Sequence, residues 1–405
     1  MTFESICARD FFSPSDHDTH GSHILPIHQT STFLYPSAQE AMAVFRGEQD
    51  AYIYSRWSNP TVEAVERKLA MLEGYGLGAN NKPLPLKALL FSSGMAAISS
   101  MLQAVVQPGG RILTSGNIYG TTVELMQVPL QDHGIETIFT DLHDLEATEQ
   151  MLKQEDAIQL LYVETPTNPT IEIYDLQALA DLAHTYGAKL AVDNTFSSPY
   201  LQQPFRWGAD FVVHSTTKYL NGHGTALGGV WLGKDIEFMS TKGWQMRKLF
   251  GGNSNAQEAW LLNNGLKTLP LRMQQHCANA AQLADWLHNH PAVAKVNYAG
   301  LPDHAGHELA TLQMRDYGGM VSFELKGGLE AGKQMMDKIT FCSLTSTLGT
   351  PDTLITHPAS MTHVKVPAEQ REAYGITDGL IRMSVGLEAL EDIQADLAQA
   401  LKFKV

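Results

Sequence analysis

The sequence has few cysteines and no long apolar run. Its 405 residues include only Cys7, Cys277 and Cys342, which are odd in number and far apart. Such a set fits neither a disulfide framework nor a zinc site, and it suits a reducing compartment. No stretch reaches the about 18 uninterrupted apolar residues that a membrane-spanning helix requires. Residues 1–5 lack a basic region leading into an apolar run, so we expect no secretory signal and a cytoplasmic protein.

Basic charge is also scarce. The chain carries 28 Lys and Arg against 43 Asp and Glu, a formal net charge of −15. This balance repels phosphate backbones and anionic lipids, so we expect neither nucleic acid nor a membrane as partner. Hydrophobic residues make up 44% of the chain, which is enough for a large core and excludes disorder as the main state. At about 100–200 residues per domain, the length predicts two or three domains.

The pattern of the sequence changes twice along the chain. Residues 1–60 show little periodicity and predict an irregular segment. A helix is then predicted from Asn59-Pro60 to Gly74, because Asn caps helices and Pro suits their first position. Five apolar runs with the length of strands follow at 88–91, 111–114, 158–163, 189–192 and 211–213. Alternating with helical stretches, they predict an α/β domain with a parallel sheet covered on both faces.

The last third of the chain predicts a different architecture. Strand-like runs at 320–325 and 380–385 lie between helices, such as those expected at 278–288 and 388–401. This part reads as a smaller α+β domain.

Polar residues follow three of the predicted strands, at the edge where ligands of open α/β sheets bind. Residues 92–95 lead into a helix whose free amides suit phosphate, although the same residues also fit a simple tight turn. Asp193 is a candidate partner for a cation, or a helix cap. Residues 214–217 lead to Lys218, which can attack a carbonyl if the site is partly desolvated. A lone lysine is more often solvated.

One cofactor accounts for these features together. Pyridoxal 5′-phosphate needs a lysine for its aldehyde, an acid for its pyridine nitrogen and a cup for its phosphate. Lys218, Asp193 and the turns at 92–95 and 214–217 would supply them.

The chain resembles the Cys/Met-metabolism family of pyridoxal-phosphate enzymes. This family includes cystathionine synthases and lyases, methionine γ-lyase and O-acylhomoserine sulfhydrylases. The stretches that carry the resemblance are Tyr54–Thr61, Ser92–Ala97, Tyr119–Thr122, Glu164–Pro169, Val192–Pro199, His214–His223, Thr356–His363 and Arg382–Glu388. They follow one another in the family's order.

The resemblance implies the aspartate-aminotransferase type of fold, called fold type I. Residues 1–60 would form an arm that contacts the neighbouring subunit, residues 61–260 a large cofactor domain, and residues 261–405 a C-terminal domain. It also implies a homotetramer of two catalytic dimers.

The resemblance also implies roles for individual residues. Lys218 would bind the cofactor's aldehyde, and Asp193 would pair with its pyridine nitrogen. Tyr119 would stack on the ring and act as acid or base, Asn168 would lie near the ring oxygen, and Arg382 would clamp the substrate carboxylate.

The phosphate would be held from two subunits. The resemblance assigns it to Gly94, Met95, Ser215 and Thr217 of one subunit and to Tyr54 and Arg56 of its neighbour. Tyr54 would also contact the substrate, together with Ser346 and Thr347.

Other motifs compete weakly with this interpretation. Residues 228–234 have the spacing of a phosphate-binding P-loop, but Asp235 stands where Ser or Thr should bind magnesium, so we predict a strand there. Four histidines, His17, His20, His23 and His28, do not have the spacing of a known metal site, and we expect a solvated or interface segment. His357 and His363 are expected to be structural or to shape the site.

The reaction is the least determined feature. Family members that act on cystathionine tend to carry Glu where this chain has Ile53 and Ser346, so we expect a small or neutral γ-substituent. Against methionine γ-lyase, Thr121 replaces a reactive cysteine, and residues 247–248, Arg-Lys, replace a Lys-Asp pair. Trp57 would either line a neighbour's pocket or simply pack.

We expect γ-elimination of the methionine γ-lyase type, giving 2-oxobutanoate, ammonia and a thiol. The alternative is γ-replacement, as in O-acylhomoserine sulfhydrylase or cystathionine γ-synthase. A non-catalytic protein on this fold is disfavoured because Lys218, Asp193, Tyr119 and Arg382 are all present.

Overall fold

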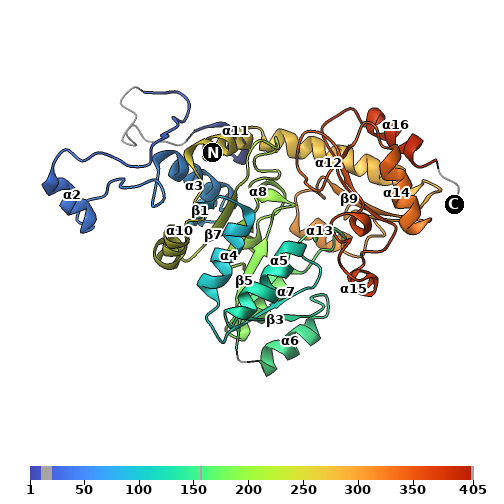
Figure 1. Ribbon diagram of the computed structural model, residues 1–405, viewed down its shortest axis with the longest axis horizontal. Coiled ribbons are helices and arrows are strands. Elements are labelled where there is room, and N and C mark those ends of the chain that lie inside the picture. The colour runs from blue at the N-terminus through green and yellow to red at the C-terminus, as the bar shows by residue number, and fades with distance from the viewer. Residues whose placement is uncertain (11–20, 156, 403–405) are drawn as a thin grey trace.

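The computed structural model describes residues 1–10, 21–155 and 157–402. Figure 1 shows a large α/β body, an arm that carries α2 (Ala38–Phe45) away from it, and a second sheet in the C-terminal part of the chain. None of the described helices is long and apolar enough to cross a membrane.

The central sheet has seven strands in the order β1-β7-β6-β5-β4-β2-β3. Their bounds are β1 Lys87–Phe91, β2 Arg111–Thr114, β3 Glu136–Phe139, β4 Ile158–Glu164, β5 Lys189–Asp193, β6 Phe211–His214 and β7 Gly229–Gly233. β3, β2, β4, β5 and β6 are joined by parallel pairings, whereas β7 runs antiparallel to both β6 and β1. The five predicted strands are confirmed, as is the strand predicted at the P-loop-like residues.

Apart from the edge strand β3, the strands of this sheet are buried on both faces, as their continuous apolar runs predict. Leu90, Leu161 and Val192 belong to one apolar cluster, and Tyr162 and Val213 to the cluster on the other face. A separate cluster fills the C-terminal part of the chain.

The second sheet has five strands in the order β10-β11-β12-β9-β8. Their bounds are β8 Val293–Asn297, β9 Met320–Leu325, β10 Ser343–Leu344, β11 Leu354–Thr356 and β12 Leu380–Ser384. Only β9 and β12 were predicted. β10 and β11 have two and three residues, too few for a recognisable pattern, and Lys295 interrupts β8 on an exposed side.

Helices cover both sheets. Up to residue 267, and besides α2, they are α1 Phe3–Ala8, α3 Pro60–Glu73, α4 Gly94–Val105, α5 Gly120–Leu125, α6 Leu145–Gln154, α7 Leu176–Thr185, α8 Ser198–Leu201, α9 Ile236–Phe238, α10 Trp244–Phe250 and α11 Ala256–Lys267. The others are α12 Leu269–His288, α13 His307–Gln313, α14 Gly328–Lys338, α15 Ala368–Ala373 and α16 Leu390–Ala400. α12, predicted only from residue 278, begins at Leu269 and runs from the large body into the C-terminal part (Figure 1).

The helix signals at residues 59–74 act as predicted. The side chain of Asn59 accepts a hydrogen bond from the Thr61 amide, Pro60 occupies the first turn, and Gly74 ends α3.

The prediction of an irregular segment over residues 1–60 is wrong in two places. α1 buries Phe3 and Ile6 in the main core, and α2 is capped by Ser37. Both helices have eight residues or fewer, so their apolar positions span about two turns and show no clear period.

Candidate active site

The predicted residues meet in one cavity at the carboxyl edge of the central sheet. Those that line it are Gly94, Met95, Tyr119, Asn168, Asp193, Ser215, Thr217, Lys218, Ser346 and Arg382. Thr347 joins them through a hydrogen bond from Lys218 Nζ to its Oγ1, 2.9 Å long. Parallel strands bring residues that are distant in the sequence to this edge, because their carboxyl ends all lie on the same side.

One end of the cavity is a cradle for an anion. The side chain and carbonyl of Ser93 accept the amides of Ala96 and Ala97. The amides of Gly94 and Met95, by contrast, have no acceptor in the part of the chain that the structure describes. A Cβ on Gly94 would lie 2.8 Å from Cβ of Ser215, so only glycine allows α4 to start this close to the loop that follows β6. Free amides and nearby hydroxyls suit phosphate.

Asp193, the last residue of β5, lies at the floor of the cavity. Its Oδ1 accepts the Thr195 amide at 3.0 Å and the Thr195 hydroxyl at 2.5 Å, and its Oδ2 lies 3.3 Å from the Tyr162 hydroxyl. Burial raises the pKa of Asp193, although the Thr195 donors oppose the shift. No Lys or Arg side chain among the described residues forms an ion pair with it. A protonated ring nitrogen would supply the missing cation, so the residue fits the predicted cofactor.

Lys218 follows β6, and the positive charge of Arg382 acts on its amine. Burial, and then the positive charge of Arg382, lower the pKa of Lys218 to about 8. An amine with this pKa loses its proton much more readily than an exposed lysine, which suits a nucleophile for an aldehyde.

Arg382 lies in β12 and is buried. Its Nη1 donates to Asn168 Oδ1 at 3.0 Å, and its Nη2 donates to the Thr347 carbonyl at 3.0 Å. Nε has no partner among the described residues. Burial lowers the pKa of the guanidinium to about 10, and the group stays charged at neutral pH. An arginine fixed in this way, with a donor to spare, is suited to a carboxylate.

Two polar residues of the site, Glu164 and Thr195, were not predicted. Glu164 ends β4 beside Asp193 and accepts the amides of Tyr119 at 2.8 Å and Asn168 at 3.1 Å. Burial and the neighbouring Asp193 charge raise the pKa of Glu164 well above its usual range. Thr195 couples Asp193 to the phosphate cradle, since its Oγ1 also accepts the Ser215 amide at 2.9 Å. The available signal for Glu164 was its place at a strand end, the same signal that identified Asp193.

Tyr54 and Arg56 lie outside this cavity. They line a surface hollow with Trp57. Arg56 Nη1 donates to the carbonyl of Lys248, whose Nζ lies 3.5 Å from the ring centre of Trp57. In a single subunit this turn is therefore fixed against α10 and away from the cavity.

A larger outer cavity, about 550 Å³ against about 220 Å³, adjoins the inner one. The two share Tyr119, Asn168, Ser346 and Arg382. Thr121 and His363 line the outer cavity, so His363 shapes the approach to the site as predicted.

The remaining histidines have other surroundings. His357 is structural, because its ring nitrogens contact the Ser360 hydroxyl and the Asp378 carbonyl. His17 and His20 lie outside the described residues. Within the described ranges, no group of three or more His, Cys, Asp or Glu could hold a metal ion.

Comparison with known proteins decides the family. Residues 12–402 match the family model described as Cys/Met metabolism PLP-dependent enzyme. The chain belongs to this family. It is 45% identical over 389 residues to an L-methionine gamma-lyase of Fusobacterium nucleatum, covering 95% of this chain and 94% of the relative. It is 40% identical to an O-succinylhomoserine sulfhydrylase of Pseudomonas aeruginosa, over 94% of this chain and 91% of that one.

A solved structure agrees. The cystathionine gamma-lyase of Lactobacillus plantarum, complexed with L-serine, matches with a TM-score of 0.88 and 36% identity, over 99% of this chain and 98% of that one. The fold is thus fold type I, and this Cys/Met-metabolism protein is an enzyme that depends on pyridoxal phosphate.

The low pKa of Lys218 predicts how the cofactor-free protein captures pyridoxal phosphate. Only the neutral amine attacks an aldehyde, so the capture rate should rise through pH 8 and level off above about pH 9. Stopped-flow absorbance would measure the rate, with Lys218→Ala as the control that forms no covalent adduct at the site. A rate that keeps rising beyond pH 10 would show that Lys218 has an ordinary amine.

Proposed function

We propose that this enzyme catalyses γ-elimination on an amino acid with a small, uncharged γ-substituent, as methionine γ-lyase does. The products are 2-oxobutanoate, ammonia and a thiol. The observation that carries the proposal is the uncharged side chain at position 346 in the wall of the substrate site. Ser346 lies in both cavities where a carboxylate would be needed to receive the distal ammonium of cystathionine. The 45% identity to an L-methionine gamma-lyase supports the same reaction.

The cofactor supplies an aldehyde that condenses with amines and a ring that takes up the electrons released at the substrate's α-carbon. Asp193 would pair with the ring nitrogen and keep that nitrogen protonated. The amides of Gly94 and Met95, with the hydroxyls of Ser215 and Thr217, would hold the phosphate.

The other residues act on the substrate. Arg382 binds the α-carboxylate and so fixes the orientation of the amino acid. The Lys218 amine would take the α-proton and move it away, which allows a second deprotonation at the β-carbon. The electron pair released there expels the γ-substituent, and Tyr119 would donate a proton to this departing group. Asn168, bonded to Arg382, would contact the ring oxygen, and Thr347 accepts a hydrogen bond from Lys218.

The second candidate is γ-replacement, in which a thiol or sulfide takes the place of the departing group. Two observations favour it. A relative named O-succinylhomoserine sulfhydrylase is 40% identical, and the outer cavity leaves room for a second reactant beside Tyr119 and Ser346.

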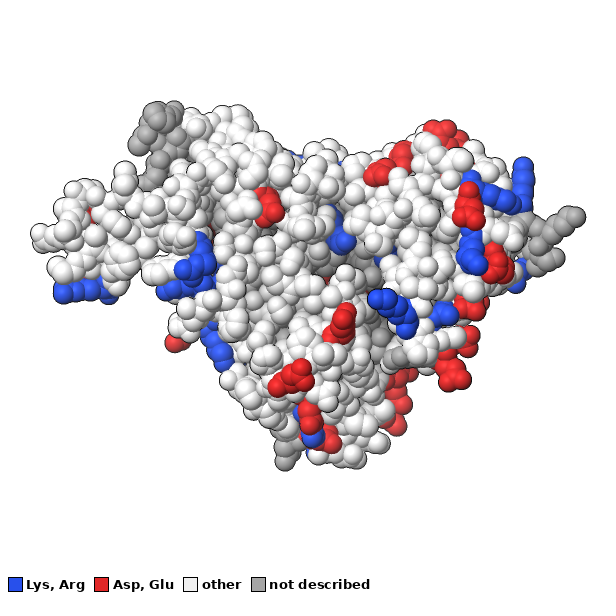
Figure 2. Space-filling view, viewed as in Figure 1, with Lys and Arg blue, Asp and Glu red and all other residues white. Residues whose placement is uncertain are grey.

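The proposal includes the assembly. Residues 1–60 form an arm that contacts the neighbouring subunit, residues 61–260 the cofactor domain and residues 261–405 the C-terminal domain, in a cytoplasmic tetramer of two catalytic dimers. Leu34 and Phe45 of the arm are 96% and 62% exposed in one subunit. Figure 2 shows few charged side chains across the arm and the adjoining part of the large body, which suits a covered surface. Tyr54 and Arg56 then complete the neighbour's phosphate site.

A substrate panel tests the reaction. Methionine, homocysteine, cystathionine and O-acetyl- and O-succinylhomoserine are each assayed with and without a thiol, and 2-oxobutanoate is followed by a coupled assay. We expect rapid oxo-acid formation from methionine or homocysteine without a thiol. Slow oxo-acid formation, with a thiol diverting the substrate into a new amino acid, would establish γ-replacement instead.

Ser346→Glu tests whether the uncharged side chain at position 346 sets the substrate preference. A carboxylate at this position should attract the distal ammonium of cystathionine and raise the ratio of kcat/KM for cystathionine over methionine by about tenfold or more. Ser346→Gln has nearly the same size without the charge and should not raise the ratio. If both variants change it equally, Ser346 does not read the distal group.

Mixed dimers test the shared site. Lys218→Ala and Arg56→Ala proteins should each be nearly inactive, whereas randomly mixed dimers should recover about a quarter of the activity, because half are hybrids with one complete site in two. Recovery would be measured after co-refolding, with hybrid formation checked by differently tagged subunits. Hybrids without activity would mean that each site is built within one subunit.

A further inference from the structure

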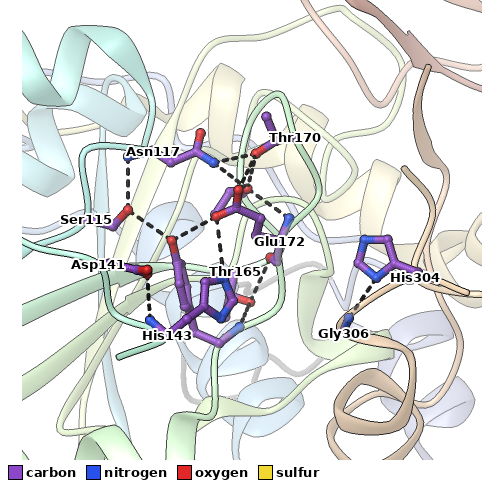
Figure 3. A network of polar contacts seen from close by, with 11 residues as sticks. Ser115, Asn117, Asp141, His143, Thr165, Thr170, Glu172, His304 and Gly306 are labelled. Carbon is purple, nitrogen blue, oxygen red and sulfur yellow. Dashed lines mark hydrogen bonds and ion pairs between the residues drawn. The ribbon is translucent and has the colours of Figure 1, made fainter. Parts of the chain in front are cut away.

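Beside the outer cavity, which Asn117 lines, a polar network joins two loops that both lead into the site (Figure 3). Residues 115–119 follow β2 and end at Tyr119, and residues 165–174 follow β4 and include Asn168. In Figure 3 side chains from both loops meet around Glu172.

Glu172 connects the two loops through Tyr174. Its Oε2 lies 3.1 Å from the Tyr174 hydroxyl, which lies 2.9 Å from Ser115 Oγ. Its Oε1 accepts from Thr170 Oγ1 at 3.4 Å, and its amide donates to Thr167 Oγ1 at 2.9 Å. The carboxylate thus bonds its own loop and, through Tyr174, reaches the loop that carries Tyr119.

Asn117 makes a second connection between the loops. Its side-chain amide donates to the hydroxyls of Thr170 and Thr167, and its backbone amide donates to Ser115 Oγ at 3.0 Å. Asn117 is two residues from Tyr119, and Thr167 is next to Asn168. The network therefore fixes the bases of both catalytic loops.

Two carboxylates contact these loops. Glu164 holds Tyr119 and Asn168 directly by their amides and is buried. The Glu172 side chain is 34% exposed and forms an ion pair of 3.6 Å with His143, which is 48% exposed. Solvent protons can reach the second pair, so its charge follows the pH.

The charges of this pair support each other. Contact with the Glu172 carboxylate raises the pKa of His143, against the effect of its burial. Burial opposes the charge of Glu172, but the interaction with His143 and hydrogen bonds from neighbours outweigh it and lower the pKa of Glu172. The other titratable or charged groups around the pair are Asp141, Tyr174 and His304, with Lys295, Asp303 and His307 facing His304.

We propose that Glu172 is a positioning residue for Tyr119 and Asn168, and that His143 makes its hold on the two loops dependent on pH. The inference rests on the roles of Tyr119 and Asn168 in the proposed function. Below the raised pKa of His143 the imidazolium anchors the carboxylate. Above it the charge is lost, and Glu172 keeps only neutral donors. The loops are then held less firmly.

Hydrogen exchange followed by mass spectrometry tests the hold on the loops without any substrate. In the Glu172→Ala holoenzyme, the amides of residues 115–122 and 165–174 should exchange faster than in the unsubstituted enzyme. Exchange elsewhere should be unchanged. Glu330→Ala is the matched control, because Glu330 forms an exposed ion pair with Lys333 on α14. Exchange like that of the control would overturn the proposal. Faster exchange throughout the large body would also overturn it, since Glu172 would then support the fold in general.

Kinetics test the consequence for the site. Glu172→Ala should lower kcat by about 10–100-fold, the effect of displacing catalytic groups, while KM and cofactor affinity change less than about threefold. Glu172→Gln keeps an acceptor for Tyr174 and should retain more activity. In the unsubstituted enzyme, kcat should fall as the pH rises through the pKa of His143. This fall should be absent in both Glu172→Gln and His143→Gln.

The outcomes separate this inference from the proposed reaction. Faster loop exchange with an unchanged kcat and pH profile would overturn the positioning role. The substrate panel decides the reaction on its own, because the loop exchange does not depend on which amino acid reacts.

Discussion

Two buried carboxylates, side by side at the ends of β4 and β5, are the constraint on which the site depends. Glu164 and Asp193 are paired in the sheet register, and no cation of the described chain forms an ion pair with either. Burying such charges is unfavourable unless hydrogen bonds and a counter-charge compensate. Both acids accept hydrogen bonds, and a protonated ring nitrogen of the cofactor would supply the counter-charge that Asp193 lacks among the described residues.

The rest of the site is arranged around these acids. Glu164 fixes the backbone of Tyr119 and Asn168, and Thr195 links Asp193 to Ser215 of the phosphate cradle. Across the cavity, burial and then the positive charge of Arg382 lower the pKa of Lys218. The positive charges are thus on the substrate side and the negative ones on the sheet side, so a bound cofactor and a substrate carboxylate would each meet an opposite charge.

Much of this was predictable from the sequence, because long apolar strands and the polar residues after them are local patterns. Asp193 and Lys218 were found in this way. Glu164 also follows a strand, but its role was missed because its partners are backbone amides of distant residues, which no side-chain pattern encodes. The helices within residues 1–60 and the short strands β10 and β11 were missed because they are too short for periodicity, and tertiary contacts define them.

The claim that the carboxyl edge around Lys218 holds the cofactor can be tested directly. Borohydride reduction of the holoenzyme fixes the cofactor on the lysine that binds its aldehyde, and peptide mass mapping identifies that lysine. If Lys218 binds the cofactor's aldehyde, we expect a single labelled peptide containing Lys218, with the label absent from the Lys218→Ala protein. A label on any other lysine of the native enzyme would contradict it.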